Sequence, residues 1–157
     1  MIHRLEDRIR RLLDTQVQCV LATVSEGYPQ QHLMAYAFEP SLETVYLVSR
    51  RRTEKVVNMV QWPSIALLWD NRTGNTLDHA AGTALMAQGQ AEVLHGWVCA
   101  RAAYLLRERS IELAPLLARD DAVVFACRIE SYRHCRGYSD VSTYCPQAGQ
   151  AVLAEAS

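Results

Sequence analysis

Short β-prone segments that follow one another through tight turns dominate the first half of this chain. Ser-Glu-Gly-Tyr-Pro at 25–29 and Glu-Pro-Ser at 39–41 are typical turn sequences between such segments. Strands joined by turns this short pair antiparallel, because a parallel pair needs a long crossover connection. With later segments of the same kind, six strands are predicted, at residues 19–24, 31–38, 44–49, 64–69, 84–94 and 122–132.

Helical periodicity lies around these strands. Residues 3–15 and 97–109 each place apolar side chains on one face, and a short helix is expected between Thr53, a good N-cap, and Pro63. A further helical piece covers 111–117. We therefore predict a mainly β fold with flanking helices, an antiparallel sheet or barrel with the helices packed at its side. A single domain over 1–157 is expected, with a core at 3–135 and a tail at 137–157.

Charge and composition exclude several classes of protein. The formal net charge of 157 residues is −1, which gives no general attraction to nucleic acid or to an anionic membrane. We expect no membrane span and no signal peptide, because no apolar run is long enough. Five widely spaced cysteines without a C-x-x-C pair indicate a reducing cytoplasm, and most of them are expected in the core. The histidines show no metal-ligand spacing, so no metal site is predicted.

Basic and hydroxyl residues gather where the third predicted strand meets the short helix. Ser49 and Thr53 flank three consecutive arginines, Arg50, Arg51 and Arg52, and Lys55 follows. A helix start offers free N–H groups and the positive end of its dipole, so this segment is suited to hold a phosphate. A solvated basic loop is the alternative. No G-x-G-x-x-G or Walker loop accompanies the segment, and the standard nucleotide-binding folds are not supported.

Several short motifs occur in a distinctive order around this segment. They are Gly27-Tyr28-Pro29, the strand end Y-L-V-S-R at 46–50, Thr53-Glu54-Lys55, N-x-x-x-x-P at 58–63 and A-Q-G-Q-A-E at 87–92. In this order they resemble the pyridoxamine 5′-phosphate oxidase-like FMN-binding split-barrel family, over about residues 3–135. The resemblance implies a six-stranded antiparallel split β-barrel and a homodimer that holds FMN at its interface.

The resemblance also implies a set of cofactor-binding residues. It places Ser49, Arg50, Thr53 and Lys55 at the FMN phosphate, with Arg51 or Arg52 as a possible substitute for Arg50. It further places the strand at 32–36 beside the isoalloxazine and Gln88 at a polar contact to the flavin.

Two residues outside the basic segment are also candidates for the cofactor site. His32 is either a flavin or phosphate contact or an ordinary hydrogen-bonded strand histidine. Asn71, beside Arg72 at a strand end, either reaches the mouth of a pocket or shapes a turn.

The chain departs from the oxidase at two points. His32 and Ala37 stand where the oxidase carries Arg and Lys, and the C-terminal W-x-x-x-R-L-x-P ending is missing. Vitamin B6 is therefore not the expected substrate. The sequence favours an FMN-dependent oxidoreductase that acts on an unknown small molecule by hydride transfer at flavin N5, with no catalytic residue that can be named. The alternatives are a non-catalytic flavin-binding or sensing protein and a haem- or F420-binding relative on the same fold.

Overall fold

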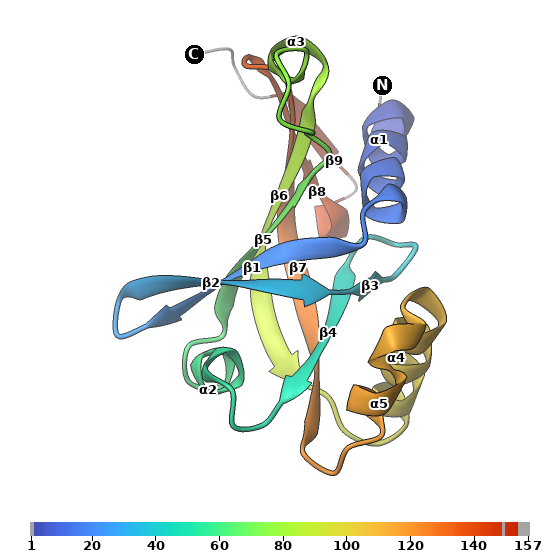
Figure 1. Cartoon of the computed structure of the whole chain (residues 1–157). Helices are drawn as coiled ribbons and strands as arrows, with labels where there is room; N and C mark the ends of the chain where they lie inside the picture. Colours follow the sequence, from blue (N-terminus) through green and yellow to red (C-terminus); the bar gives the residue numbers. More distant parts are fainter. Residues whose placement is uncertain (1, 149, 154–157) are drawn as a thin grey trace.

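Nine antiparallel strands form one curled sheet in the computed structural model, which describes residues 2–148 and 150–153 (Figure 1). The main path runs β2-β1-β5-β6-β7-β4-β3, and β8 pairs with β7 and β9. The strands are β1 (Gln18–Ser25), β2 (Tyr28–Ala35), β3 (Ala37–Phe38), β4 (Thr44–Arg50), β5 (Ser64–Asp70), β6 (Thr83–Val93), β7 (Ala122–Arg136), β8 (Asp140–Cys145) and β9 (Gln150–Leu153). The predicted antiparallel fold is confirmed, but the prediction of six strands is wrong. The segment at 31–38 breaks at Tyr36 into β2 and β3, and the tail adds β8 and β9.

Helices cover both sides of this sheet (Figure 1). The apolar stripe of α1 (Ile2–Thr15) consists of Leu5, Ile9, Leu12 and Leu13, which are all buried in the main core. A second, smaller core lies between the sheet and α4 (Gly96–Arg109), where Ala102 and Leu106 pack against β4 and β7. The shorter helices are α2 (Glu54–Gln61), α3 (Asp78–Ala81), α5 (Ala114–Leu117), η1 (Ile111–Leu113) and η2 (Pro146–Ala148). None of the helices in the described ranges is both long and apolar enough to cross a bilayer.

Tyr36, at the break between β2 and β3, joins the main core to the end of α1. Its hydroxyl lies 2.6 Å from the carbonyl oxygen of Leu13 and 2.8 Å from that of Gln16. Arg109 of α4 donates to the same two carbonyls, and its guanidinium also covers the rings of Tyr36 and Phe38. These contacts satisfy carbonyl groups that the end of α1 leaves without intrahelical partners.

A β-bulge divides the longest strand pair. The register of β6 and β7 shifts between Gln88 and Gly89, and Glu130 is the extra residue of β7. A Cβ atom on Gly89 would lie 2.1 Å from the carbonyl oxygen of Arg128, so only glycine fits there. The core-facing residues of β7 are Phe125, Cys127 and Ile129 before the bulge and Tyr132 and His134 after it.

All five cysteines are free thiols. Only Cys19 and Cys127 are buried core residues, so the expectation that most cysteines lie in the core is wrong. Cys99, Cys135 and Cys145 are half-buried because they lie on α4 and on the β7–β8 pair near the edge of the two cores.

Candidate functional site

The junction between β4 and α2 brings two hydroxyl groups to the start of a helix. Ser49 ends the buried part of β4, and its Oγ lies 3.1 Å from Oγ1 of Thr53. Thr53 donates its hydroxyl hydrogen to the carbonyl oxygen of Arg50 at 2.7 Å, so Ser49 is the donor between the two side chains. Thr53 occupies the predicted N-cap position, but its side chain makes no cap hydrogen bond to α2. The first N–H groups of α2 are therefore not capped by a side chain and are free to donate hydrogen bonds to an anion.

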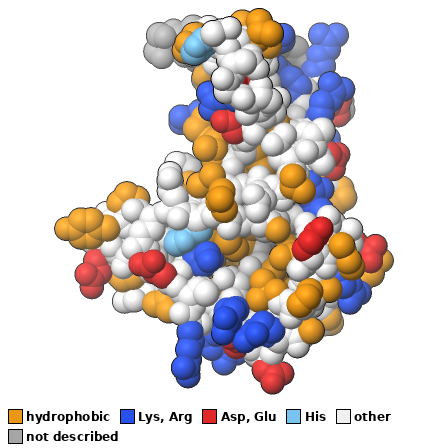
Figure 2. Space-filling view, viewed as in Figure 1, with side chains coloured by type: hydrophobic (Ala, Val, Ile, Leu, Met, Phe, Trp, Pro, Cys, Tyr) orange, Lys and Arg blue, Asp and Glu red, His pale blue; other side chains and the backbone are white. Residues whose placement is uncertain are grey.

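Cations surround this helix start. Figure 2 shows Lys and Arg side chains gathered over the loop that joins β4 to α2. Arg51 and Arg52 are exposed on this loop, and Lys55 is half-buried on the first turn of α2. Within the described ranges, no carboxylate forms an ion pair with any of these three side chains. The junction is thus locally positive in a chain whose net charge is −1.

Arg50 differs from its neighbours because it already has an anionic partner. Its Nε donates to Oδ2 of Asp121 at 3.2 Å, and Arg119 donates to the same carboxylate at 2.7 Å. Arg119 first and Arg50 second hold the pKa of Asp121 down at about 2. A phosphate at the junction would compete with Asp121 for the Arg50 guanidinium.

His32 lies on the core-facing side of β2, next to α2. Its Nε2 is 2.9 Å from Oγ1 of Thr23, which is fully buried. Burial lowers the pKa of the imidazole, and the positive charge of Lys55 lowers it further, so His32 lies within the electrostatic reach of the junction. Within the described ranges, no group of three or more His, Cys, Asp or Glu side chains is arranged to hold a metal ion.

Only some side chains of the strand predicted to face the flavin are accessible to a ligand. Met34 and Tyr36 are buried in the core, so neither is available to a ligand. Leu33 is 71% exposed, and it projects from the opposite face of β2. A ring placed along 32–36 would therefore meet Leu33 and the strand backbone.

Gln88 lies apart from the junction, on the outer face of the sheet. It lines a cavity of about 300 Å³ whose wall also includes Ala22, Ala66, Met86 and Arg133. Gln31 lines the same cavity, whereas its neighbour His32 faces the core side. Gln88 and His32 therefore lie on opposite faces of the sheet in one chain.

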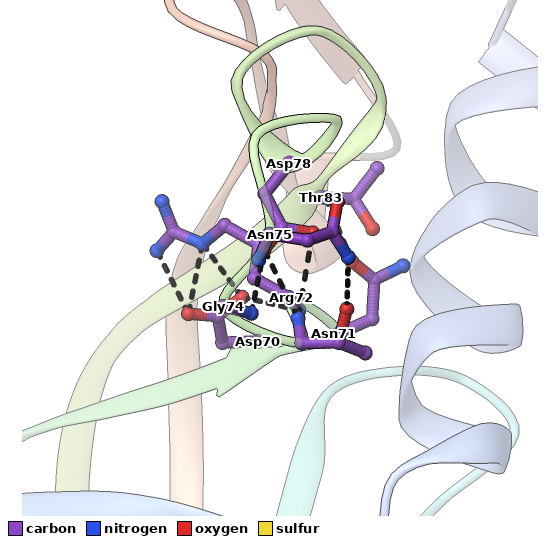
Figure 3. A network of polar contacts seen from close by, with 8 residues as sticks. Asp70, Asn71, Arg72, Gly74, Asn75, Asp78 and Thr83 are labelled. Carbon is purple, nitrogen blue, oxygen red and sulfur yellow. Dashed lines mark hydrogen bonds and ion pairs between the residues drawn. The ribbon is translucent and has the colours of Figure 1, made fainter.

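Asn71 lies at the far end of β5, in a loop closed by its own polar contacts (Figure 3). Its Oδ1 accepts the N–H of Thr83 at 2.8 Å. Arg72 binds Asp70 through two donors, and Asp78 accepts the N–H groups of residues 73–75. From Ser64, next to α2, β5 carries the chain roughly 20 Å to this loop. The structure gives Asn71 a role in the turn and does not bring it to the junction within one chain.

Three contributions to the site come from residues that sequence reasoning did not single out. Thr23 and Asn58 are buried polar side chains beside His32, and Asp121 is the carboxylate that binds Arg50. Asn58 had a sequence signal, because it begins the N-x-x-x-x-P motif at 58–63. Thr23 and Asp121 had none, since their partners are distant in the sequence.

Comparison with known proteins agrees with this fold. Solved structures that are similar include a haem binding protein from Mycobacterium smegmatis, with a TM-score of 0.81 and 18% identity over 92% of this chain and 59% of that chain. ChuZ from Campylobacter jejuni has a TM-score of 0.80 and 11% identity, over 97% of this chain and 63% of that chain. A Clostridium acetobutylicum protein related to general stress protein 26, of the pyridoxinephosphate oxidase family, has a TM-score of 0.71 and 17% identity over 94% and 98% of the two chains.

These identities are low, so the structural matches establish the fold and not the activity. The chain also spans only 59% of the length of the Mycobacterium smegmatis protein. A search of curated proteins gave no match. A family model described as pyridoxamine 5′-phosphate oxidase, however, matches residues 5–131, which is most of the chain. The chain belongs to the pyridoxamine 5′-phosphate oxidase family.

Proposed function

We propose that this protein binds FMN, with its phosphate at the β4–α2 junction, and acts as an FMN-dependent oxidoreductase on a small molecule. The observation that carries the proposal is Lys55, a half-buried cation with no carboxylate partner within the described ranges, at an uncapped helix start. Ser49 and Thr53 add hydroxyl groups beside it. This donor set suits a terminal phosphate monoester, and the family of the chain supports the same reading.

The protein and the cofactor have separate tasks in this proposal. Bound FMN supplies hydride transfer chemistry, and the chain binds and orients it. Lys55, with Arg51 or Arg52, neutralises the phosphate, while Ser49 donates a hydrogen bond to it. Leu33 and the backbone of β2 offer an apolar surface to the ring system.

A second copy of the chain would complete the site. The outer sheet face exposes apolar side chains of β1, β5 and β6 around the 300 Å³ cavity, and Leu33 of β2 adds to them. Apolar side chains gathered on one face of a sheet in this way favour association. Gln88 and Asn71, which lie away from the junction in their own chain, would reach FMN only from the partner. We therefore propose a homodimer with FMN at its interface.

The decisive experiment compares FMN with riboflavin, which lacks the phosphate. Lys55→Ala should weaken FMN binding by about tenfold to a hundredfold, because a charge-assisted hydrogen bond is lost. Riboflavin binding should not change. Arg11→Ala removes an exposed cation from α1, away from the junction, and serves as the matched control. Equal FMN affinity of the Lys55 variant and the parent protein would remove the support for a phosphate site.

Haem is the second candidate ligand, because the similar Mycobacterium smegmatis structure is that of a haem binding protein. A haem would need an axial ligand. His32 is engaged by Thr23, His134 is buried, and His79 stacks on Tyr138. The absorption spectrum of the purified protein separates the candidates. Flavin bands with FMN as the released species support the proposal, while a Soret band supports haem.

A further inference from the structure

A continuous chain of hydrogen bonds runs from the surface of α2 to His32. Glu54 Oε1 lies 2.7 Å from Gln30 Nε2, and Gln30 Oε1 lies 2.7 Å from Asn58 Nδ2. Asn58 Nδ2 is 3.1 Å from Thr23 Oγ1, which in turn is 2.9 Å from His32 Nε2. Asn58 is only 3% exposed and Thr23 is fully buried, so the middle of the chain is shielded from water.

The chemistry of these groups fixes which one donates and which one accepts in each hydrogen bond. The Glu54 carboxylate can only accept, so Gln30 donates to it and accepts from Asn58 through its other amide atom. Asn58 uses its second amide hydrogen on Thr23. Within the described ranges, the hydrogen-bond partners of Thr23 Oγ1 are Asn58 and His32, so its single hydrogen goes to His32 Nε2. A ring nitrogen that accepts carries no proton, which leaves the proton on Nδ1.

The electrostatic surroundings agree with a neutral imidazole. Burial and Lys55 lower the pKa of His32, and Glu54 opposes them. Both charged groups come from α2. On β1 and β2, the polar neighbours in the chain of hydrogen bonds are the uncharged Thr23 and Gln30. A proton added at Nε2 would also face the hydroxyl hydrogen of Thr23, which would have to turn away and lose its acceptor.

We propose that Glu54, Gln30, Asn58 and Thr23 are positioning residues that hold His32 as a neutral Nδ1–H donor for the phosphate bound beside Lys55. The ligand-binding part rests on the proposed function. In this arrangement a neutral Nδ1–H group of His32, and not a second positive charge beside Lys55, contacts the phosphate. Phosphate affinity then depends on pH through the phosphate itself, and His32, held neutral, adds no proton uptake of its own on binding.

The first test uses the protein without ligand. Long-range proton–nitrogen NMR correlations report which ring nitrogen of each histidine carries the proton, and the His32→Gln variant identifies the His32 signals. We expect a protonated Nδ1, an unprotonated Nε2 and a midpoint below 6.5 in a pH titration. Thr23→Val should raise this midpoint, whereas Thr23→Ser, which keeps the hydroxyl, should not. Gln30→Met, at the more exposed end of the chain, should raise it by less. A protonated Nε2 in the unaltered protein would overturn the proposal.

The second test measures FMN affinity from pH 6 to 8 in the same variants. His32→Gln should bind FMN roughly three- to tenfold more weakly, with riboflavin binding unchanged. The ratio of the Thr23→Val to the Thr23→Ser affinity should rise severalfold as the pH falls, because only the valine variant lets His32 gain a proton. The titration of the phosphate is common to both variants and cancels in this ratio. Identical pH profiles would overturn the positioning role. If the unaltered protein bound no FMN, the proposed function and the phosphate contact would both fail, while the NMR result would still decide the tautomer.

Discussion

Replacing Arg109 by alanine should destabilise the fold at the point where α4 holds the end of α1. The change removes hydrogen bonds to the carbonyl groups of Leu13 and Gln16 and to the Tyr36 hydroxyl, together with the cover of two aromatic rings. A hydrogen bond from a charged group contributes about 1.5–3 kcal/mol. Tyr36, with its single hydroxyl hydrogen, can still donate to one of these carbonyls, so the three bonds will not add in full.

We therefore expect the free energy of unfolding to fall by about 2–4 kcal/mol, which lowers Tm by about 4–16 °C in a chain of this size. Urea and thermal unfolding measure the change directly. Arg107→Ala is the matched control, because Arg107 lies on the same helix and, among the described residues, its guanidinium pairs only with the Tyr104 ring, 5.9 Å from the ring centroid. Combining Arg109→Ala with Tyr36→Phe should give a non-additive loss. An Arg109→Ala protein within 0.5 kcal/mol of the parent would refute this account of the contact.

Three further outcomes follow from other contacts. Asp121→Asn should raise FMN affinity roughly twofold to threefold at physiological salt, because it frees Arg50 and removes a negative charge from the junction. Asp120→Asn should act less in the same titration. Burial is the main reason why the pKa of His134 is lowered, so the unfolded chain binds a proton before the folded chain does as the pH falls. The free energy of unfolding should therefore decline below pH 6.5. Urea unfolding at a series of pH values measures this decline, which should be less steep for His134→Gln. Gly89→Ala should cost about 1–3 kcal/mol in the same unfolding assay, and Gln90→Ala very little, because only the first places a Cβ against the Arg128 carbonyl.

The sequence predicts the elements whose signals are local. The strands around Leu21, Leu47 and Leu67 alternate or are uniformly apolar, and the helix after Thr53 has both a start and a stop signal. The break at Tyr36 escapes sequence reasoning because its cause is tertiary, a hydroxyl bound to the end of α1. The tail escapes because β8 has mixed polarity and is held by pairing with β7.

The candidate site likewise contains residues with a local sequence signal and residues that only the tertiary structure brings together. Lys55, Ser49 and Thr53 are close in sequence, so a charge cluster is enough to find them. The pairing of Arg50 with Asp121 spans 71 residues, and the contact of Asn58 with Thr23 spans 35. Nothing local marks such pairs, because they depend on which strands become neighbours. The roles of Asn71 and Gln88 as partner-supplied contacts remain predictions for the dimer.

Because Glu130 is an unpaired extra residue, the two halves of β7 present residues of opposite parity to the core. Deleting Glu130 would leave Ile129 and Tyr132 two positions apart, so the two halves would join in strict alternation and the same side chains would still face the core. The deletion would remove the bulge, and with it the local kink and the extra twist of the strand. The strand thus carries a phase boundary, and Glu130 is the residue that separates its two phases.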